Sequence, residues 1–180
     1  MKTKVCELLD IEFPILAFTH CRDVVAAVTK AGGFGVLGAA GHTPEQLDID
    51  LKWIHDEVGD KPFGVDIIVP AKYEGKQEGE LSSKDLRDMI PPKHREWLDG
   101  LLEKYDVPPL PESDRKTTMA GEAEPPMSFS QAVPLMDVAF SHPISLIVNA
   151  LGPPPPEMMA RAKEAGVLTA ALAGKALSLI

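Results

Sequence analysis

Short apolar runs alternate with longer amphipathic segments along most of this chain. The runs richest in residues that favour β-strands lie at 13–19, 34–38, 63–69, 144–149 and 167–172. Apolar residues recur instead at helical spacing over 22–30, 44–58 and 157–165. This alternation predicts an α/β fold with a parallel sheet, in which the strands are neighbours in chain order.

The segment 30–47 shows the boundaries of these elements in most detail. Gly32 and Gly33 end the preceding helix, because glycine accepts the left-handed backbone conformation that closes a helix. An apolar run thinned by glycines follows and suits a strand covered on both faces. Thr43 is a good helix N-cap and Pro44 fits the first helical position, so the next helix is predicted to begin there.

Gly33, Gly35 and Gly38 match the G-x-G-x-x-G spacing of dinucleotide-binding loops. That motif binds a pyrophosphate only where a strand precedes the glycines and a helix begins at the last of them. Here a helix precedes Gly33 and the strand lies between the glycines, so we interpret them as structural. A weak repeat between residues 28–39 and 161–172 is typical of a (β/α) barrel.

The composition changes after the third predicted strand. Residues 72–84 are charged and contain glycine, 92–105 carry a helical apolar face, and 106–126 are rich in proline and polar residues. We expect 106–126 to be mobile, because they cannot bury enough apolar surface to offset the entropy of ordering. A further helix is predicted near 129–139, shortened or kinked by Pro134. Residues 71–140 are therefore interpreted as an insertion, and as a lid over an active site.

The composition excludes several classes of protein. The chain has 180 residues, 44% of them hydrophobic, which is enough for one domain with a substantial core. No apolar run reaches the length of a membrane span, and the net charge of -9 argues against nucleic acid or an anionic membrane as a partner. The two cysteines and the lack of a signal-peptide run predict a cytoplasmic location. No residues have metal-ligand spacing, so no metal is expected.

Several motifs follow one another in an informative order. They are Phe13-Pro-Ile-Leu-Ala, Lys30-Ala-Gly-Gly-Phe-Gly-Val-Leu-Gly-Ala, Thr43-Pro-Glu-Gln-Leu, Lys61-Pro-Phe-Gly-Val, Pro154-Pro-Pro-Glu and Ala165-Gly-Val. Together they resemble the nitronate monooxygenase family, also called 2-nitropropane dioxygenases. This family comprises FMN-dependent (β/α)8 barrels related to a flavin-dependent enoyl-acyl-carrier-protein reductase. The resemblance implies a TIM-barrel type fold with about five parallel βα units in this chain.

The resemblance also implies an activity and a site. It implies FMN as cofactor and the oxidation of alkyl nitronates by molecular oxygen. In the family, an Ala-Pro-Met segment after the first strand lines the flavin, and the third strand commonly reads Gly-Val-Asn. This chain has Ala17-Phe-Thr-His20 and Gly64-Val-Asp66 instead, and it departs from the family again at Asn149. The implied cofactor-binding residues are Ala17, Phe18, Thr19, His20, Asp66 and Asn149.

Other functions remain open at this point. One alternative is an NAD(P)H-dependent flavin or enoyl-thioester reductase of the same superfamily, and another is a non-catalytic half-barrel. Relatives continue with a Gly-Gly-His segment that holds the catalytic base, so that histidine is expected beyond Ile180 and none is assigned within this chain. A fragment, a truncated product or one chain of a two-chain barrel would each explain this end. Such a chain is expected to associate with itself through open sheet edges and not to oxidise nitronates alone.

The polar candidates each have a structural interpretation as well. His20 is either a site residue at the end of a strand or a histidine of a surface turn. Asp66 is either a buried functional carboxylate or a residue that faces solvent at the mouth of the barrel. The other histidines, at positions 42, 55, 94 and 142, are predicted to be solvated.

Overall fold

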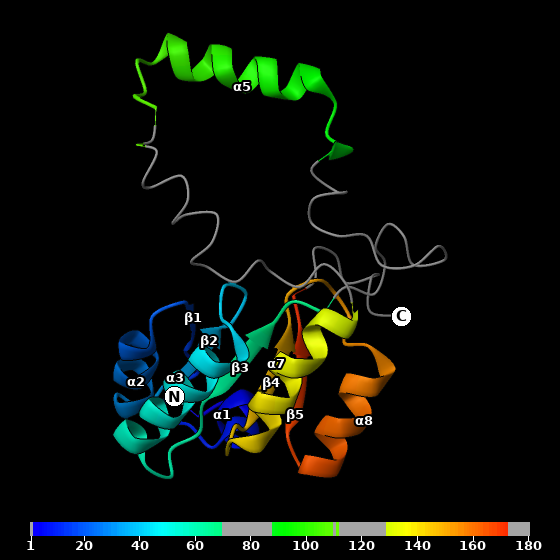
Figure 1. The fold of residues 1–180 in the computed structure, drawn as a ribbon. Helices are drawn as coiled ribbons and strands as arrows, with labels where there is room; N and C mark the ends of the chain where they lie inside the picture. The colour runs from blue at the N-terminus through cyan, green and yellow to red at the C-terminus, as the bar shows by residue number, and fades with distance from the viewer. Residues whose placement is uncertain (1, 70–87, 110, 112–128, 173–180) are drawn as a thin grey trace. The chain divides into compact units, whose positions relative to one another are not determined.

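The computed structural model describes residues 2–69, 88–109, 111 and 129–172 (Figure 1). The chain divides into two units, of which one comprises residues 1–71 with 123–180 and the other residues 72–122. The charged excursion predicted at 72–84 lies outside the described residues, as does most of the segment 106–126 that was predicted to be mobile. Each unit is described here by itself.

A five-stranded parallel sheet forms the centre of the first unit. Its strands are β1 (Leu16–Thr19), β2 (Phe34–Gly38), β3 (Gly64–Ile67), β4 (Leu146–Asn149) and β5 (Leu168–Ala171). They are hydrogen-bonded in the order β1-β2-β3-β4-β5, and every pair is parallel. The predicted fold class and strand order are therefore confirmed. Consecutive parallel strands without a jump in order are the arrangement found in a (β/α)8 barrel.

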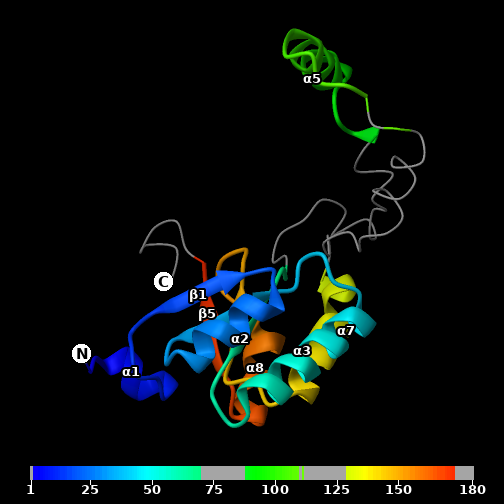
Figure 2. The same cartoon turned by 90° about the vertical axis from the view of Figure 1, so that its left-hand side faces the viewer.

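Helices cover one face of this sheet. They are α2 (Arg22–Lys30), α3 (Pro44–Val58), α7 (Phe129–Ser141) and α8 (Pro156–Ala165), and Figure 2 shows them on the same side of the strands. The short helix α1 (Lys4–Leu9) contributes Leu9 to the other face. We call the face that carries α2, α3, α7 and α8 the helix-covered face, and the opposite one the inner face.

Alternate strand residues supply two separate cores. On the helix-covered face, Leu37, Val65 and Ile147 pack among apolar helix residues. On the inner face, Phe34 and Val148 pack with Leu9 and two further strand residues. Each large apolar side chain that is fully buried contributes about 1.5–3 kcal/mol of transfer free energy, so the larger helix-covered core carries most of the stabilisation. Register across the sheet keeps residues of the same face in line.

The glycines at β2 are structural, as predicted. Gly33 precedes the strand, and Gly35 and Gly38 lie within it, so no helix begins at the motif. A Cβ at Gly35 would lie 2.5 Å from the carbonyl oxygen of Val25, which shows that α2 can approach the sheet only over a glycine. The backbone N–H of Gly35 also donates to Thr29 Oγ1 at 3.2 Å. Gly35 therefore serves helix–sheet packing, and the order of elements is not that of a dinucleotide-binding loop.

Helix α7 extends further than the sequence suggests and belongs to the helix layer. It runs to Ser141 with Pro134 inside it, and Ala132, Leu135 and Met136 are buried in the helix-covered core. Pro134 lies on the exposed side of the helix and does not end it. The last part of the range interpreted as an insertion at 71–140 thus packs with the sheet, and its role as a lid stays a prediction.

The described part of the second unit contains helix α5 (Pro92–Lys104), which agrees with the helix predicted over 92–105. None of its residues is buried within the described structure, and Trp97, Leu98 and Leu102 are exposed. Among the described helices, none is both long enough and apolar enough to cross a membrane.

Candidate functional site

Polar residues gather where the carboxyl ends of the parallel strands meet. His20 follows β1, Gly38 ends β2, Asp66 lies near the end of β3, and Asn149 ends β4. Because the strands are parallel and in register, these ends lie along one edge of the sheet. Ligands of barrel enzymes bind at this edge, so we treat it as the candidate site.

The first strand sends its residues to both faces. Leu16 and Phe18 are in register with Phe34 and Val36, which belong to the inner core, so they face inward. Ala17 and Thr19 alternate with them and face the helices. Thr19 Oγ1 accepts a hydrogen bond from the backbone N–H of Cys21 at 3.0 Å, which supports the turn into α2. Of the predicted segment 17–20, the residue that the strand turns inward is therefore Phe18, while His20 follows the strand.

The side chain of His20 has a defined orientation. Its Nδ1 lies 2.9 Å from the carbonyl oxygen of Gly38. A carbonyl oxygen can only accept, so Nδ1 carries the proton and the neutral ring keeps its lone pair on Nε2. The edge of the ring also meets Phe18, with centroids 5.1 Å apart and an angle of 82° between the planes. A Cβ at Gly38 would lie 2.6 Å from Phe18 and 2.8 Å from His20, so this arrangement requires a glycine there.

Asp66 is a buried carboxyl group next to this histidine arrangement. It is in register with Gly38 on one side and Val148 on the other, and only 3% of its surface is exposed. Burial raises the pKa of Asp66 from 3.8 to about 6, against the smaller opposing effects of the His20 charge and the Ala150 backbone N–H. Asp66 therefore keeps its proton up to a higher pH than a solvated aspartate does. The alternative interpretation of Asp66, as a solvent-facing residue, is wrong.

Asn149 ends β4, as the sequence predicted, and its side chain binds backbone groups. Its side chain is fully buried, and Oδ1 accepts from the backbone N–H of Val69 at 2.9 Å. Its Nδ2 donates to the carbonyl oxygens of Val69 at 3.2 Å and Pro153 at 3.3 Å. The amide thus ties the loop after β3 to the loop after β4. A contact between Asn149 and a cofactor stays a prediction.

A second polar cluster at this edge was not predicted. Asp50 on α3 is 8% exposed and accepts three hydrogen bonds from side chains. The donors are Arg22 Nη1 at 2.8 Å, His42 Nε2 at 3.0 Å and Gln46 Nε2 at 3.0 Å. This Asp50 cluster joins the start of α2 to the loop between β2 and α3. The sequence contained one signal that could have identified this cluster. Asp50 stands at helical spacing from Leu47 and Ile54, and therefore on the apolar side of the helix.

Two histidines predicted to be solvated are instead largely buried and paired. The side chain of His42 is 11% exposed and bonded to Asp50, and that of His142 is 12% exposed and bonded to Asp48 at 2.8 Å. The prediction failed because each histidine pairs with an aspartate that a different segment supplies. His94 on α5 is exposed, as expected.

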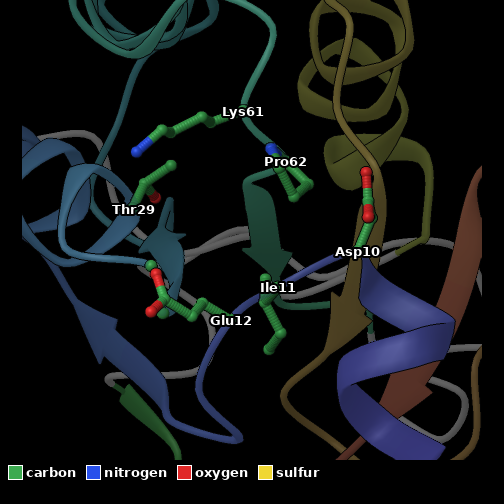
Figure 3. Close-up of a pocket in the computed structure, with 8 residues that line it drawn as sticks. Asp10, Ile11, Glu12, Thr29, Lys61 and Pro62 are labelled. Carbon is green, nitrogen blue, oxygen red and sulfur yellow. The ribbon is translucent and has the colours of Figure 1, made fainter. Parts of the chain in front are cut away.

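A small hollow lies at the opposite edge, where the strands begin. Its volume is about 190 Å³, and Figure 3 shows Glu12, Thr29 and Lys61 around it. Lys61 Nζ donates to the carbonyl oxygen of Lys30 at 2.8 Å, and Thr29 accepts from Gly35, so these polar groups hold backbone segments together. The amino ends of barrel strands serve stability, and we assign this hollow no catalytic role. The described residues contain no cluster of three metal-ligating side chains.

The fold and the candidate site define a class of protein. Consecutive parallel βα units with titratable groups at the carboxyl ends are the architecture of barrel enzymes. The chain belongs to the nitronate monooxygenase family, whose sequence model matches residues 2–179. The expected family is therefore confirmed.

Individual relatives agree with this assignment. The chain is 49% identical over 176 residues to "Putative monooxygenase Rv1533" of Mycobacterium tuberculosis (strain ATCC 25618 / H37Rv), and the match covers 98% of this chain and 46% of that protein. It is 31% identical over 75 residues to "Probable nitronate monooxygenase" of Staphylococcus saprophyticus, which covers 39% of this chain and 21% of the relative. The chain thus spans less than half the length of the relatives that it matches.

Two solved structures share the fold. FabK from Thermotoga maritima superposes with a TM-score of 0.59 and 20% identity, over 99% of this chain and 39% of that one. Nitroalkane oxidase from Streptomyces ansochromogenes gives a TM-score of 0.58 and 21% identity, over 95% of this chain and 42% of that one. At this identity the likeness concerns the fold and not the activity.

Proposed function

We propose that this protein is part of an FMN-dependent oxidoreductase that oxidises alkyl nitronates with molecular oxygen. The observation that carries the proposal is the position of Phe18, His20 and Asp66 at one end of the inner face, in a chain of the nitronate monooxygenase family. An aromatic ring, an oriented imidazole and a buried carboxyl group form a site suited to a flat, partly polar ligand.

The groups at this edge fit the ring system of FMN. Phe18 offers exposed apolar surface at this edge, and the carboxyl group of Asp66 can accept from a ring N–H or, when protonated, donate to a ring acceptor. When bound, FMN would accept electrons from the nitronate and pass them to oxygen. The protein residues orient the ligands, exclude water and set the local charge.

The charge of Asp66 sets a condition on this function. An ionised carboxylate next to an anionic nitronate or a reduced flavin is unfavourable in a buried site. Because the pKa of Asp66 is raised to about 6, protonation is readily available close to neutral pH. We therefore assign Asp66 the role of a proton-exchanging neighbour of the ligand and His20 that of an oriented polar group beside it.

Cofactor binding can be tested on the chain itself. FMN is titrated with the 180-residue protein, and the flavin fluorescence and absorbance bands are recorded. If the flavin ring lies at this edge, the quenching should saturate. The affinity for FMN should be weaker by about tenfold or more in Phe18→Ala. The matched control is Phe140→Ala, which removes a phenyl ring from α7 on the helix-covered face. Binding that is equal in both variants would refute the assignment of the ring site.

Oxidation is tested on the protein isolated from its native source. Oxygen consumption with propyl nitronate, in the presence of added FMN, is the expected activity. Reduction of the flavin by NADH without nitronate would instead support the reductase of the same superfamily. A protein that shows neither reaction and takes up no flavin would support a non-catalytic role. These outcomes separate the proposed activity from its alternatives.

A further inference from the structure

We propose that His20 and Asp66 form a proton-binding pair, and that a small organic anion binds at this edge together with one proton taken up by Asp66. This inference rests on the proposed function in one respect only, namely that the ligand is a carbon-acid anion such as a nitronate. It assigns to this chain an acid–base role that the resemblance to the family places elsewhere. We call these residues the His20–Asp66 pair.

The first argument is the orientation of His20. The hydrogen bond from Nδ1 to the carbonyl oxygen of Gly38 fixes the ring and leaves Nε2 directed away from that carbonyl. His20 is exposed, so a ligand or solvent can reach its side chain. A backbone hydrogen bond at one ring nitrogen of a histidine fixes the tautomer of the neutral ring, and so determines whether the other nitrogen carries a proton. The absence of a side chain at Gly38 lets the ring approach this closely.

The second argument is the position of Asp66. The strand register places Asp66 next to Gly38, which holds His20, and the carboxyl group is almost completely buried. Among the described residues, His20 supplies the one side-chain charge that acts on Asp66. The other neighbouring strand, β4, supplies the apolar Val148 and the backbone N–H of Ala150. The site therefore holds one buried acid and one adjacent base, with few competing charges.

The third argument is electrostatic. Two negative charges that share a poorly solvated site repel each other, and the lower free energy is reached when one of them binds a proton. Asp66 already favours its neutral form more than a solvated aspartate does, because burial penalises the ionised carboxylate. When an anion enters, the O–H bond forms on Asp66 with a proton from solvent, and no electrons are transferred.

Proton uptake can be measured without flavin and without turnover. Isothermal titration calorimetry of propyl nitronate with the chain, in two buffers of different ionisation enthalpy at pH 7.5, counts the protons taken up. We expect about one proton for each anion bound, and an affinity that falls by up to about tenfold for each pH unit above pH 6. In Asp66→Asn, proton uptake should disappear and the affinity should lose this dependence on pH.

Further variants and a second ligand complete the test. His20→Gln, which removes the imidazole ring held beside Asp66, should weaken anion binding by about tenfold or more while proton uptake at Asp66 persists. The control His55→Gln changes a histidine in the last turn of α3, at the opposite edge, and should behave like the unchanged protein. Fully reduced FMN under anaerobic conditions is the second anion, and it distinguishes a site for the flavin from one for the nitronate.

The ligand-free protein provides an independent measurement. The 15N shifts of His20 should show the proton on Nδ1 when the ring is neutral, and the 13C shift of the Asp66 carboxyl should titrate near pH 6. A proton on Nε2, no measurable anion binding, or equal proton uptake in Asp66→Asn would each overturn the proposal. Proton-linked binding in a protein that consumes no oxygen would refute the proposed activity and leave the pair in place.

Discussion

Replacing Asp66 with asparagine should stabilise the protein at neutral pH. The native pKa of Asp66, about 6, lies above the value of 3.8 that the solvated group has. The native state therefore binds the proton more tightly than the unfolded state, and its stability falls as the pH rises from about 4 to about 6. Above pH 6 the destabilisation is complete, and below pH 4 it is absent. Asparagine has the same shape and no charge, so it removes this dependence.

The size of the effect follows from the displacement of the pKa. One pKa unit corresponds to about 1.4 kcal/mol, so the full destabilisation by the ionised carboxylate is about 3 kcal/mol. About 2 kcal/mol of this destabilisation should appear between pH 4.5 and pH 8, because the rest has already appeared below pH 4.5. Urea unfolding of Asp66→Asn and of the unchanged protein, followed by circular dichroism at several pH values, gives the difference in the free energy of unfolding.

The control for this experiment is Asp56→Asn. The Asp56 side chain is 62% exposed on α3, so its removal should change stability by less than about 0.5 kcal/mol, with little dependence on pH. Each variant is compared with the unchanged protein at the same pH, so the contribution of all other carboxyl groups to the pH dependence of stability cancels. If the stability difference for Asp66→Asn is the same at pH 4.5 and pH 8, the carboxyl group is solvated in the native state and the argument from burial is refuted.

Three further substitutions test the packing around the site, each by urea unfolding at pH 7. Asp50→Ala should cost about 2–3 kcal/mol, because it leaves buried donors without their acceptor while Arg22 keeps some access to water. Asn149→Ala should cost about 2–4 kcal/mol, since the loops after β3 and β4 lose their shared hydrogen bonds. Gly35→Ala should cost about 1–3 kcal/mol or more, because its Cβ would meet a backbone carbonyl at 2.5 Å.

Each of these substitutions has a contradicting outcome. Gly41→Ala is the control for Gly35→Ala, because an added Cβ at Gly41 meets nothing within 4 Å. Equal effects of the two glycine substitutions would mean that the close approach of α2 does not constrain β2. A loss below about 0.5 kcal/mol for Asp50→Ala or Asn149→Ala would show that water replaces the lost hydrogen bonds without penalty.

The order of the secondary structure could be predicted from the sequence. Strand and helix patterns are local, because apolar spacing, helix caps and glycines act within a few residues. Thr43 caps α3 as expected, with its side chain accepting from the backbone N–H of Gln46 at 3.1 Å. Short alternating elements leave few topologies open, so the parallel order β1 to β5 followed from the same pattern.

The tertiary structure decided which polar residues meet. Asp50 and His42 are eight positions apart, but Arg22 joins them from another helix, and no local pattern contains that contact. Asn149 pairs with Val69 across 80 positions, a choice made by strand neighbours and not by the residues beside it. Helix α7 shows the same limit, since its proline and its place at the end of the range interpreted as an insertion concealed its role in the core.

The candidate site shows most clearly what the sequence determined and what only the tertiary structure determined. The sequence by itself placed His20 directly after the apolar run at 13–19 and Asp66 in the middle of the apolar run at 63–69. Only the packed sheet determined that Asp66 is buried and that His20 is held by Gly38 of the neighbouring strand. The physical reason is that burial and hydrogen-bond partners depend on chain segments far apart in sequence, whereas strand and helix formation depends on near neighbours.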